Sequence, residues 1–130
     1  MSRPESEFHR PSAPWRRPPG APVGVWEQVL AVDPETGDAT VLQRYEPGTD
    51  TSAQGTVTHE YFEEVYILDG SLTDLRLGET FAAGTYAYRH PGMEHGPWTS
   101  PEGVMMFVIR SHTSTPGSRG HDGVASPGVP

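Results

Sequence analysis

The middle of the chain is built from short apolar runs that alternate with clusters of turn residues. No window shows the i, i+3, i+4 apolar spacing of an amphipathic helix. Apolar runs of about four to eight residues between Pro, Gly and Asp clusters are typical of strands in a sandwich or barrel. The sequence therefore predicts an all-β fold of about seven short strands without a helix.

Two of these runs carry further information. The run 63–78, "EEVYILDGSLTDLRLG", predicts two strands joined by a hairpin turn at Asp69-Gly70, since Asp-Gly is a strong two-residue turn signal. The run 104–110, "VMMFVIR", is apolar on both faces and predicts a central strand. The other predicted strands cover residues 25–32, 39–46 and 84–90.

Both ends of the chain differ in composition from its middle. Residues 1–22 hold six of the 14 prolines and four of the nine basic residues, and residues 111–130 are mostly Ser, Thr, Pro and Gly. Neither end offers enough apolar surface to offset the entropy lost on ordering. We expect a flexible Pro/Arg-rich N-terminal arm over 1–22, a single β-barrel domain over 23–110 and a disordered C-terminal tail over 111–130.

Charge and composition exclude several functional classes. The net charge is −8 and no basic stripe is present, which argues against a nucleic-acid partner. The chain has no cysteine, so it forms neither disulfides nor thiolate metal sites. The apolar run 104–109 is far shorter than the ~20 residues of a membrane-spanning helix, and the N-terminus has no apolar signal segment. We expect a cytoplasmic protein without membrane contact.

The segment 58–70, "THEYFEEVYILDG", places metal-capable groups beside a predicted buried strand. In an extended chain His59, Tyr61 and Glu63 share a face with Val65 and Ile67. If that face is the interior, Glu63 is a buried carboxylate, which is costly unless it is paired or bound to a cation. Glu60 and Glu64 then point outward.

A third ligand candidate, His95, ends the segment "HPGMEH" after the strand 84–90. Two imidazoles and one carboxylate with open positions form the facial set typical of non-haem Fe(II) and related divalent ions. The alternative is a solvated strand start at Glu63-Glu64, with His59 and His95 as ordinary surface residues.

Further candidates come from the same parity argument. Tyr61 is a candidate catalytic residue, as a phenol ligand or hydrogen-bond donor, with a packed tyrosine as the alternative. His90, the second candidate catalytic residue, shares parity with Tyr86 and Tyr88, so we expect it to face inward, either as a metal ligand or in contact with the ligands or the substrate. The candidate substrate-binding residues are Tyr45, Tyr86, Tyr88, Met93 and Trp98.

The two motifs resemble those of the cupin family. "HEYFEEVYILDG" is similar to the second half of the first cupin motif, with His59, Glu63 and Gly70 at matching positions. "GTYAYRHPGMEH" is similar to the second motif, with Gly84, Gly92 and His95 in place and His90 where proline is usual. Together the motifs cover about 40 residues in the right order. Their sequences are most similar to those of the ChrR-type and acetylacetone-dioxygenase-like branches of small monocupins.

The resemblance implies a jelly-roll barrel, frequently a homodimer, with one divalent metal ion per subunit. His59, Glu63 and His95 take three of the four usual ligand positions, and Val57 stands where the first histidine is usual. Fe(II) is the favoured ion, with Zn, Mn and Ni as alternatives. Three protein ligands leave up to three positions for water, O2 or a chelating substrate.

Three functions follow from this reading. The first is a metal-dependent enzyme acting on a small organic molecule, preferably a dioxygenase or other oxidoreductase, with cyclase, isomerase or lyase chemistry as the non-oxidative alternative. The second is a metal- or ligand-sensing module like the cupin half of an anti-sigma factor, although the helical sigma-binding domain of such proteins has no counterpart in this pattern. The third is a metal-free barrel that binds a small molecule, suggested by Val57.

Overall fold

The structure, a computed structural model, describes residues 3–112 and is almost entirely β-structure. Its elements are β1 (Val25–Val32), β2 (Ala39–Tyr45), β3 (Thr49–Asp50), a 3-10 turn η1 (Ser52–Gln54), β4 (Phe62–Asp74), β5 (Glu79–Ala82), β6 (Tyr86–Arg89), β7 (Trp98–Ser100) and β8 (Val104–Ser111). The all-β prediction is confirmed. Within the described residues no helix has the length and apolar character needed to cross a membrane.

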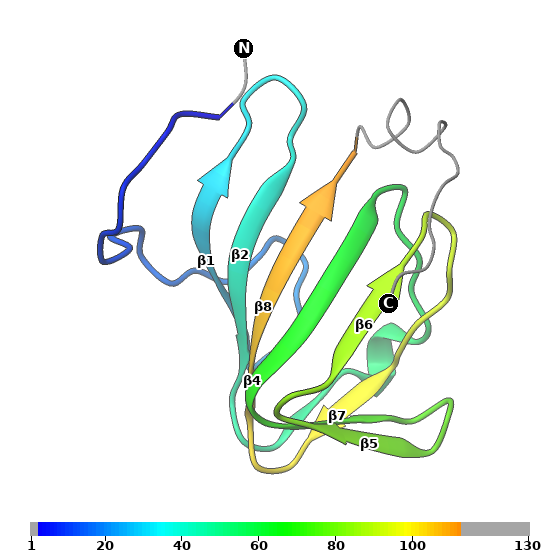
Figure 1. The fold of residues 1–130 in the computed structure, drawn as a ribbon. Coiled ribbons are helices and arrows are strands. Elements are labelled where there is room, and N and C mark those ends of the chain that lie inside the picture. Colours follow the sequence, from blue (N-terminus) through cyan, green and yellow to red (C-terminus); the bar gives the residue numbers. More distant parts are fainter. Residues whose placement is uncertain (1–2, 113–130) are drawn as a thin grey trace.

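All strand pairs are antiparallel, and they form a sheet that curls into a half-barrel (Figure 1). One wall runs β1-β2-β8-β4 and continues with β6 on the far side of β4. The other wall joins β3, β7 and β5 to the end of β4. The long strand β4 therefore belongs to both walls.

The strand β4 changes walls at a bend around Gly70. Its pairing with β8 shifts register between Ile67 and Asp69, which is a β-bulge, and Gly70 has a φ of 81°. The predicted hairpin at Asp69-Gly70 is wrong: the strand continues to Asp74, and the chain reverses over residues 75–78 instead. Asp-Gly supplies the left-handed backbone conformation that bulges and two-residue turns share, so the dipeptide alone does not distinguish them.

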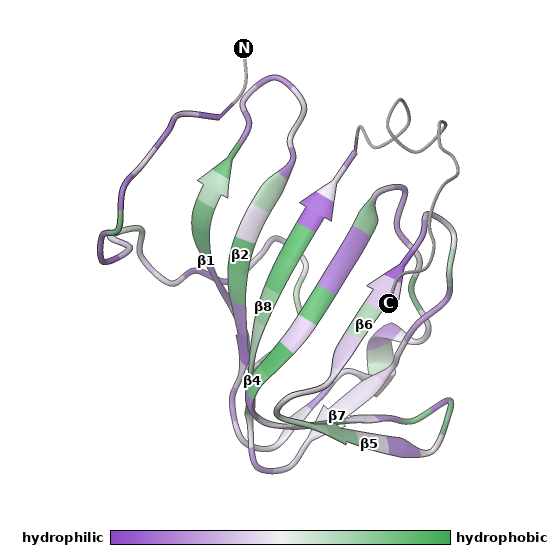
Figure 2. Cartoon of the chain, viewed as in Figure 1, coloured by the Kyte–Doolittle hydropathy of each residue, from purple (hydrophilic) through white to green (hydrophobic). Residues whose placement is uncertain are grey.

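The core lies on the concave side of the wall. β8 lies between β2 and β4, as its two apolar faces predicted, and Val108 and its neighbour Val41 are fully buried. Figure 2 shows β8 hydrophobic along most of its length, while β4 carries both hydrophobic and hydrophilic bands. Burial alternates with period two over the first half of β4, where Glu63, Val65 and Ile67 lie on the core face.

Part of the N-terminal segment packs against β1. Backbone hydrogen bonds link Arg16 and Glu27 in both directions, at 2.9 and 2.8 Å, and residues 18–22 then line the concave side of the sheet. The predicted domain boundaries at residues 22 and 110 stay predictions. The predicted C-terminal tail falls, from residue 113 on, outside the described residues.

Candidate metal centre

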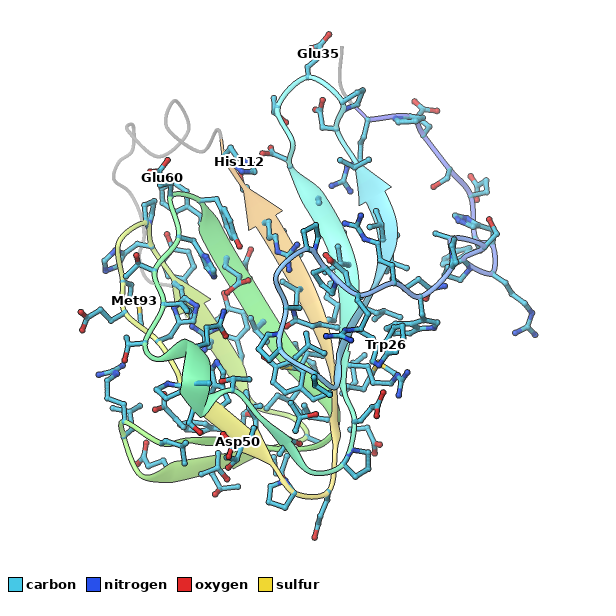
Figure 3. The ribbon with its side chains drawn as sticks, turned by 180° about the vertical axis from the view of Figure 1, so that it is seen from behind. Trp26, Glu35, Asp50, Glu60, Met93 and His112 are labelled. Atoms are coloured by element: carbon cyan, nitrogen blue, oxygen red, sulfur yellow. The ribbon has the colours of Figure 1, made fainter. Side chains whose placement is uncertain are left out.

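A cavity of about 320 Å³ opens on the concave side of the sheet. Figure 3 shows side chains crowding this side, between the sheet and the segments that cross in front of it. His59, Tyr61, Glu63 and Val65 all line the cavity, and Ile67 is buried in the core, so the predicted inward face of segment 59–67 is confirmed. Glu60 is exposed, as predicted.

Two imidazoles and a carboxylate meet at this cavity. The Nε2 atoms of His59 and His95 are 3.1 Å apart, and with a Glu63 oxygen all three ligand atoms lie within 4.8 Å of one another. Two nitrogens bound to one ion at about 2.1 Å lie roughly 3.0–3.4 Å apart. Glu63 accepts no hydrogen bond from any residue of 3–112, which leaves its lone pairs available. The three residues therefore fit a divalent ion.

The second histidine, His95, is held in the orientation that a ligand needs. Its Nδ1 donates to the Met93 carbonyl at 3.2 Å, which leaves the Nε2 lone pair directed at the site. Burial, and next the charge of Arg89, lowers the pKa of His95 to about 4, and burial also lowers the pKa of His59 against the opposing effect of Glu63. Both imidazoles are therefore neutral at pH 7, as metal ligation requires.

Two arginines that sequence reasoning missed flank Glu63. Arg89 Nη1 lies 3.7 Å from Glu63 Oε1, and Arg110 Nε lies 3.7 Å from Glu63 Oε2. The sequence predicted a metal ion because a buried Glu63 needs a compensating positive charge. These two arginines already supply such a charge. The case for a metal therefore rests on the convergence of the two imidazoles. Arg110 continues the alternation of Val104, Met106 and Val108, and that signal was present in the sequence.

Three other predicted residues line the same cavity. Tyr45 and Trp98 are each 8% exposed, and Tyr61 stacks on His59 with ring centroids 4.5 Å apart. Burial, and next the charge of Glu63, raises the pKa of Tyr45 to about 12, while burial raises the pKa of Tyr61. Both phenols stay protonated at neutral pH and are available as hydrogen-bond donors.

The remaining predicted residues lie away from the cavity. Tyr88 and His90 line neither this cavity nor a neighbouring cavity of about 220 Å³. Tyr86 and Met93 line the neighbouring cavity only. The expected inward orientation of Tyr86, Tyr88 and His90 is wrong, because Glu63 pairs with Arg89 and Val65 pairs with Ala87, so these partners face inward. Any substrate contact by the outward residues stays a prediction.

The comparisons with known proteins identify the family and the fold. A family model described as the ChrR cupin-like domain matches residues 7–114. The chain belongs to this family. No curated protein matches the sequence.

Solved structures share the cupin fold. An RmlC-like cupin from Shewanella frigidimarina NCIMB 400 is 18% identical with a TM-score of 0.65, over 87% of this chain and 96% of that chain. An acetylacetone dioxygenase from Acinetobacter johnsonii is 20% identical with a TM-score of 0.65, over 83% and 75%. The polyketide cyclase RemF from Streptomyces resistomycificus is 21% identical with a TM-score of 0.63, over 83% and 80%. At these identities the likeness shows the fold alone.

The cupin position of the missing fourth ligand lies directly beside His95. Val57 and His95 exchange backbone hydrogen bonds of 2.8 and 3.0 Å, and Val57 lines the cavity. We expect Val57→His to add a ligand and to tighten Zn²⁺ binding about tenfold or more, a gain of ~1.4 kcal/mol. Competition with a zinc-chelating dye measures the affinity. Val57→Phe is the control for ring volume, and an equal affinity of the two variants would contradict the prediction.

The cupin without metal is expected to lose stability in mild acid. Burial lowers the pKa of His95 from its ordinary value of 6.5 to about 4 in the fold, so between these pH values the unfolded state binds more protons. The free energy of unfolding therefore falls as the pH is lowered from 6.5 toward 4. Urea unfolding of chelator-treated protein at pH 7.5 and 5 measures this fall. The fall in the free energy of unfolding should be smaller for His95→Asn than for the wild type, and an equal fall in both proteins would rule out His95 as a cause.

Proposed function

We propose that this cupin is a metal-dependent enzyme that acts on a small organic molecule in the 320 Å³ cavity, with dioxygenase chemistry as the leading reaction. One observation carries the proposal: two neutral imidazoles and a carboxylate converge in a cavity large enough for a small substrate. Fe(II) is the proposed ion, one per chain. Similarity in fold to an acetylacetone dioxygenase is consistent with this choice.

The cavity residues have distinct roles in this proposal. The bound ion would be held by His59, Glu63 and His95 and would supply Lewis acidity and, as Fe(II), O2 activation. Trp98 and the valines of the wall exclude bulk water. Tyr45 donates a hydrogen bond to an oxygen of the substrate.

A general base from segment 58–70 is not part of the proposal. Glu60 is exposed, and Glu64 accepts a hydrogen bond of 2.6 Å from the Tyr86 hydroxyl on the outer face. Glu63 is the one carboxylate of this segment that lines the cavity. Proton transfer in the reaction would therefore use the substrate, water or the phenols.

Three alternatives follow from specific observations. Cyclase, isomerase or lyase chemistry needs the same site without O2, and a polyketide cyclase shares the fold. The ChrR family model favours a metal- or ligand-sensing module. The arginines beside Glu63 favour a metal-free binding cupin, because they compensate its charge without an ion. Pairing with a second copy and a cytoplasmic location stay predictions.

Metal content is the decisive test. Protein purified without a histidine tag should carry or rebind one divalent ion per chain after chelation, and failure to rebind Fe(II), Zn²⁺, Mn²⁺ or Ni²⁺ would contradict the proposal. Oxygen uptake by the Fe(II)-loaded protein should then appear with members of a panel of 1,3-dicarbonyl compounds, both neutral diketones and acids such as acetoacetate, and catechol-like compounds. No uptake across the panel would favour the non-oxidative alternatives.

A further inference from the structure

A row of three charged residues crosses the wall of the cavity. Arg110 on β8, Glu63 on β4 and Arg89 on β6 are direct cross-strand neighbours, and all three side chains line the cavity. Cross-strand neighbours lie about 5 Å apart, so the two guanidinium groups flank the carboxylate. The cavity wall thus offers two cations beside the ligand set.

The two arginines differ in how well they are paired. Arg110 Nη1 donates to Glu27 Oε2 at 2.8 Å, so this guanidinium is held by a carboxylate that is 2% exposed. Arg89 donates a hydrogen bond to no residue of 3–112, and its one ion-pair contact within 4 Å there is Glu63 at 3.7 Å. Its guanidinium packs over the Trp98 ring, 5.2 Å from the centroid, and its side chain is 11% exposed.

The Arg89 guanidinium, which donates to no residue of 3–112, has donors available to a ligand. Arginine presents five N–H donors in a planar fork that matches a carboxylate, and donors left unpaired in a buried place cost free energy. Arg89 is tolerated on the cavity wall because the carboxylate of Glu63, 3.7 Å away, partly compensates its charge. Arg89 lines both this cavity and the neighbouring cavity of about 220 Å³, so an acceptor bound there would meet its donors.

The charges of the cavity also favour an anionic ligand. The carboxylates of Glu27 and Glu63 are balanced by Arg89 and Arg110. A divalent ion on the two neutral histidines and Glu63 would leave an excess of two positive charges. An anionic substrate reduces that excess, whereas a neutral one does not.

We propose that Arg89 binds a carboxylate of the substrate, so that the substrates of this cupin are small organic acids rather than neutral diketones. The inference rests on the proposed function for the reaction, but carboxylate binding by Arg89 is testable without the metal. Arg89 is the binding residue, because Arg110 Nη1 already donates to Glu27, and Arg110 Nε, which has no hydrogen-bond partner among residues 3–112, is buried beside Glu63 out of reach of a ligand. The phenols of Tyr45 and Tyr61, which line the same cavity, add donors for a second oxygen.

Acetoacetate and its methyl ester are matched probes, because they share the carbon chain and differ in charge. Calorimetric titration of chelator-treated and Zn²⁺-loaded protein should show acetoacetate binding at least about tenfold more tightly than the ester. Arg89→Gln should remove that preference, and Arg89→Lys, which keeps the charge but not the fork, should retain part of it. Arg44 lies between the cavity-lining residues Gln43 and Tyr45 on β2 but does not line the cavity itself, so Arg44→Gln is the charge-matched control and should leave the preference intact.

The outcomes separate this inference from the proposed function. Equal binding of acid and ester to wild type, or an unchanged preference in Arg89→Gln, would overturn the carboxylate subsite even if Zn²⁺ binds stoichiometrically. An acid preference that depends on Arg89 in protein that binds no metal would uphold the subsite while the proposed function fails. Thermal unfolding of each variant checks that it is folded. If Arg89→Gln does not fold, the acid preference of Arg89→Lys decides the result, because the inference expects it to be reduced.

Discussion

Replacing Glu63 with glutamine is expected to weaken Zn²⁺ binding about 100-fold or more, whereas the same change at Glu64 leaves it unaltered. The two residues are adjacent in sequence but lie on opposite faces of β4. Glu63 is 7% exposed in the cavity, and Glu64 pairs with Tyr86 on the outer face. The glutamine retains the shape of the side chain but removes the charged oxygen that a hard divalent ion prefers.

Dye competition gives both zinc affinities, and urea unfolding gives the stability of each variant. Glu63→Gln also removes the charge between Arg89 and Arg110, so some loss of stability is expected for that variant alone. Equal zinc affinities for folded Glu63→Gln and Glu64→Gln would mean that Glu63 is not a ligand. The structure would then favour the metal-free alternative.

Replacing Gly70 with alanine is expected to cost roughly 3–5 kcal/mol of the free energy of unfolding. Gly70 has a φ of 81°, where an L side chain is strained, and a Cβ would overlap the carbonyl oxygen of Gly103. That oxygen accepts a hydrogen bond of 3.1 Å from the Ser71 amide, so the neighbouring backbone cannot withdraw without losing it. Loss of the Ser71–Gly103 hydrogen bond would destabilise the bend at which β4 passes from one wall to the other.

Gly78→Ala is the matched control for backbone strain. Gly78 has a φ of 70°, and the position that a Cβ would occupy is open, so alanine there costs only the strain, about 1–2 kcal/mol. Urea unfolding of both variants measures the difference. Similar losses for the two variants would show that the contact with Gly103 adds nothing to the strain.

Most of the ligand set was predictable because side-chain alternation along a strand is a local property. His59, Tyr61 and Glu63 share parity with Val65 and Ile67, and the apolar pair indicates which face is the interior. His95 was predictable from its place in the second motif. The same reasoning failed at Asp69-Gly70, where a local conformation common to turns and bulges was assigned to a turn.

The strand β6 shows why alternation alone does not decide orientation. Its residues alternate between aromatic side chains and Ala or Arg, and the rule that apolar groups face inward selects Tyr86 and Tyr88. The fold has the opposite arrangement, with the tyrosines outside and Arg89 inside. Arg89 is tolerated inside because pairing with β4 sets it beside the buried carboxylate of Glu63.

The sequence by itself determined the all-β class, the central place of residues 104–110 and the inward face that carries His59 and Glu63. These follow from periodicity and turn chemistry, which act over a few residues. Only the tertiary structure decided that Arg89 and Arg110 flank Glu63, that residues 18–22 line the cavity and that Gly70 bends one continuous strand. Each of these depends on the register between strands distant in sequence, and that register comes from the packing of the whole sheet.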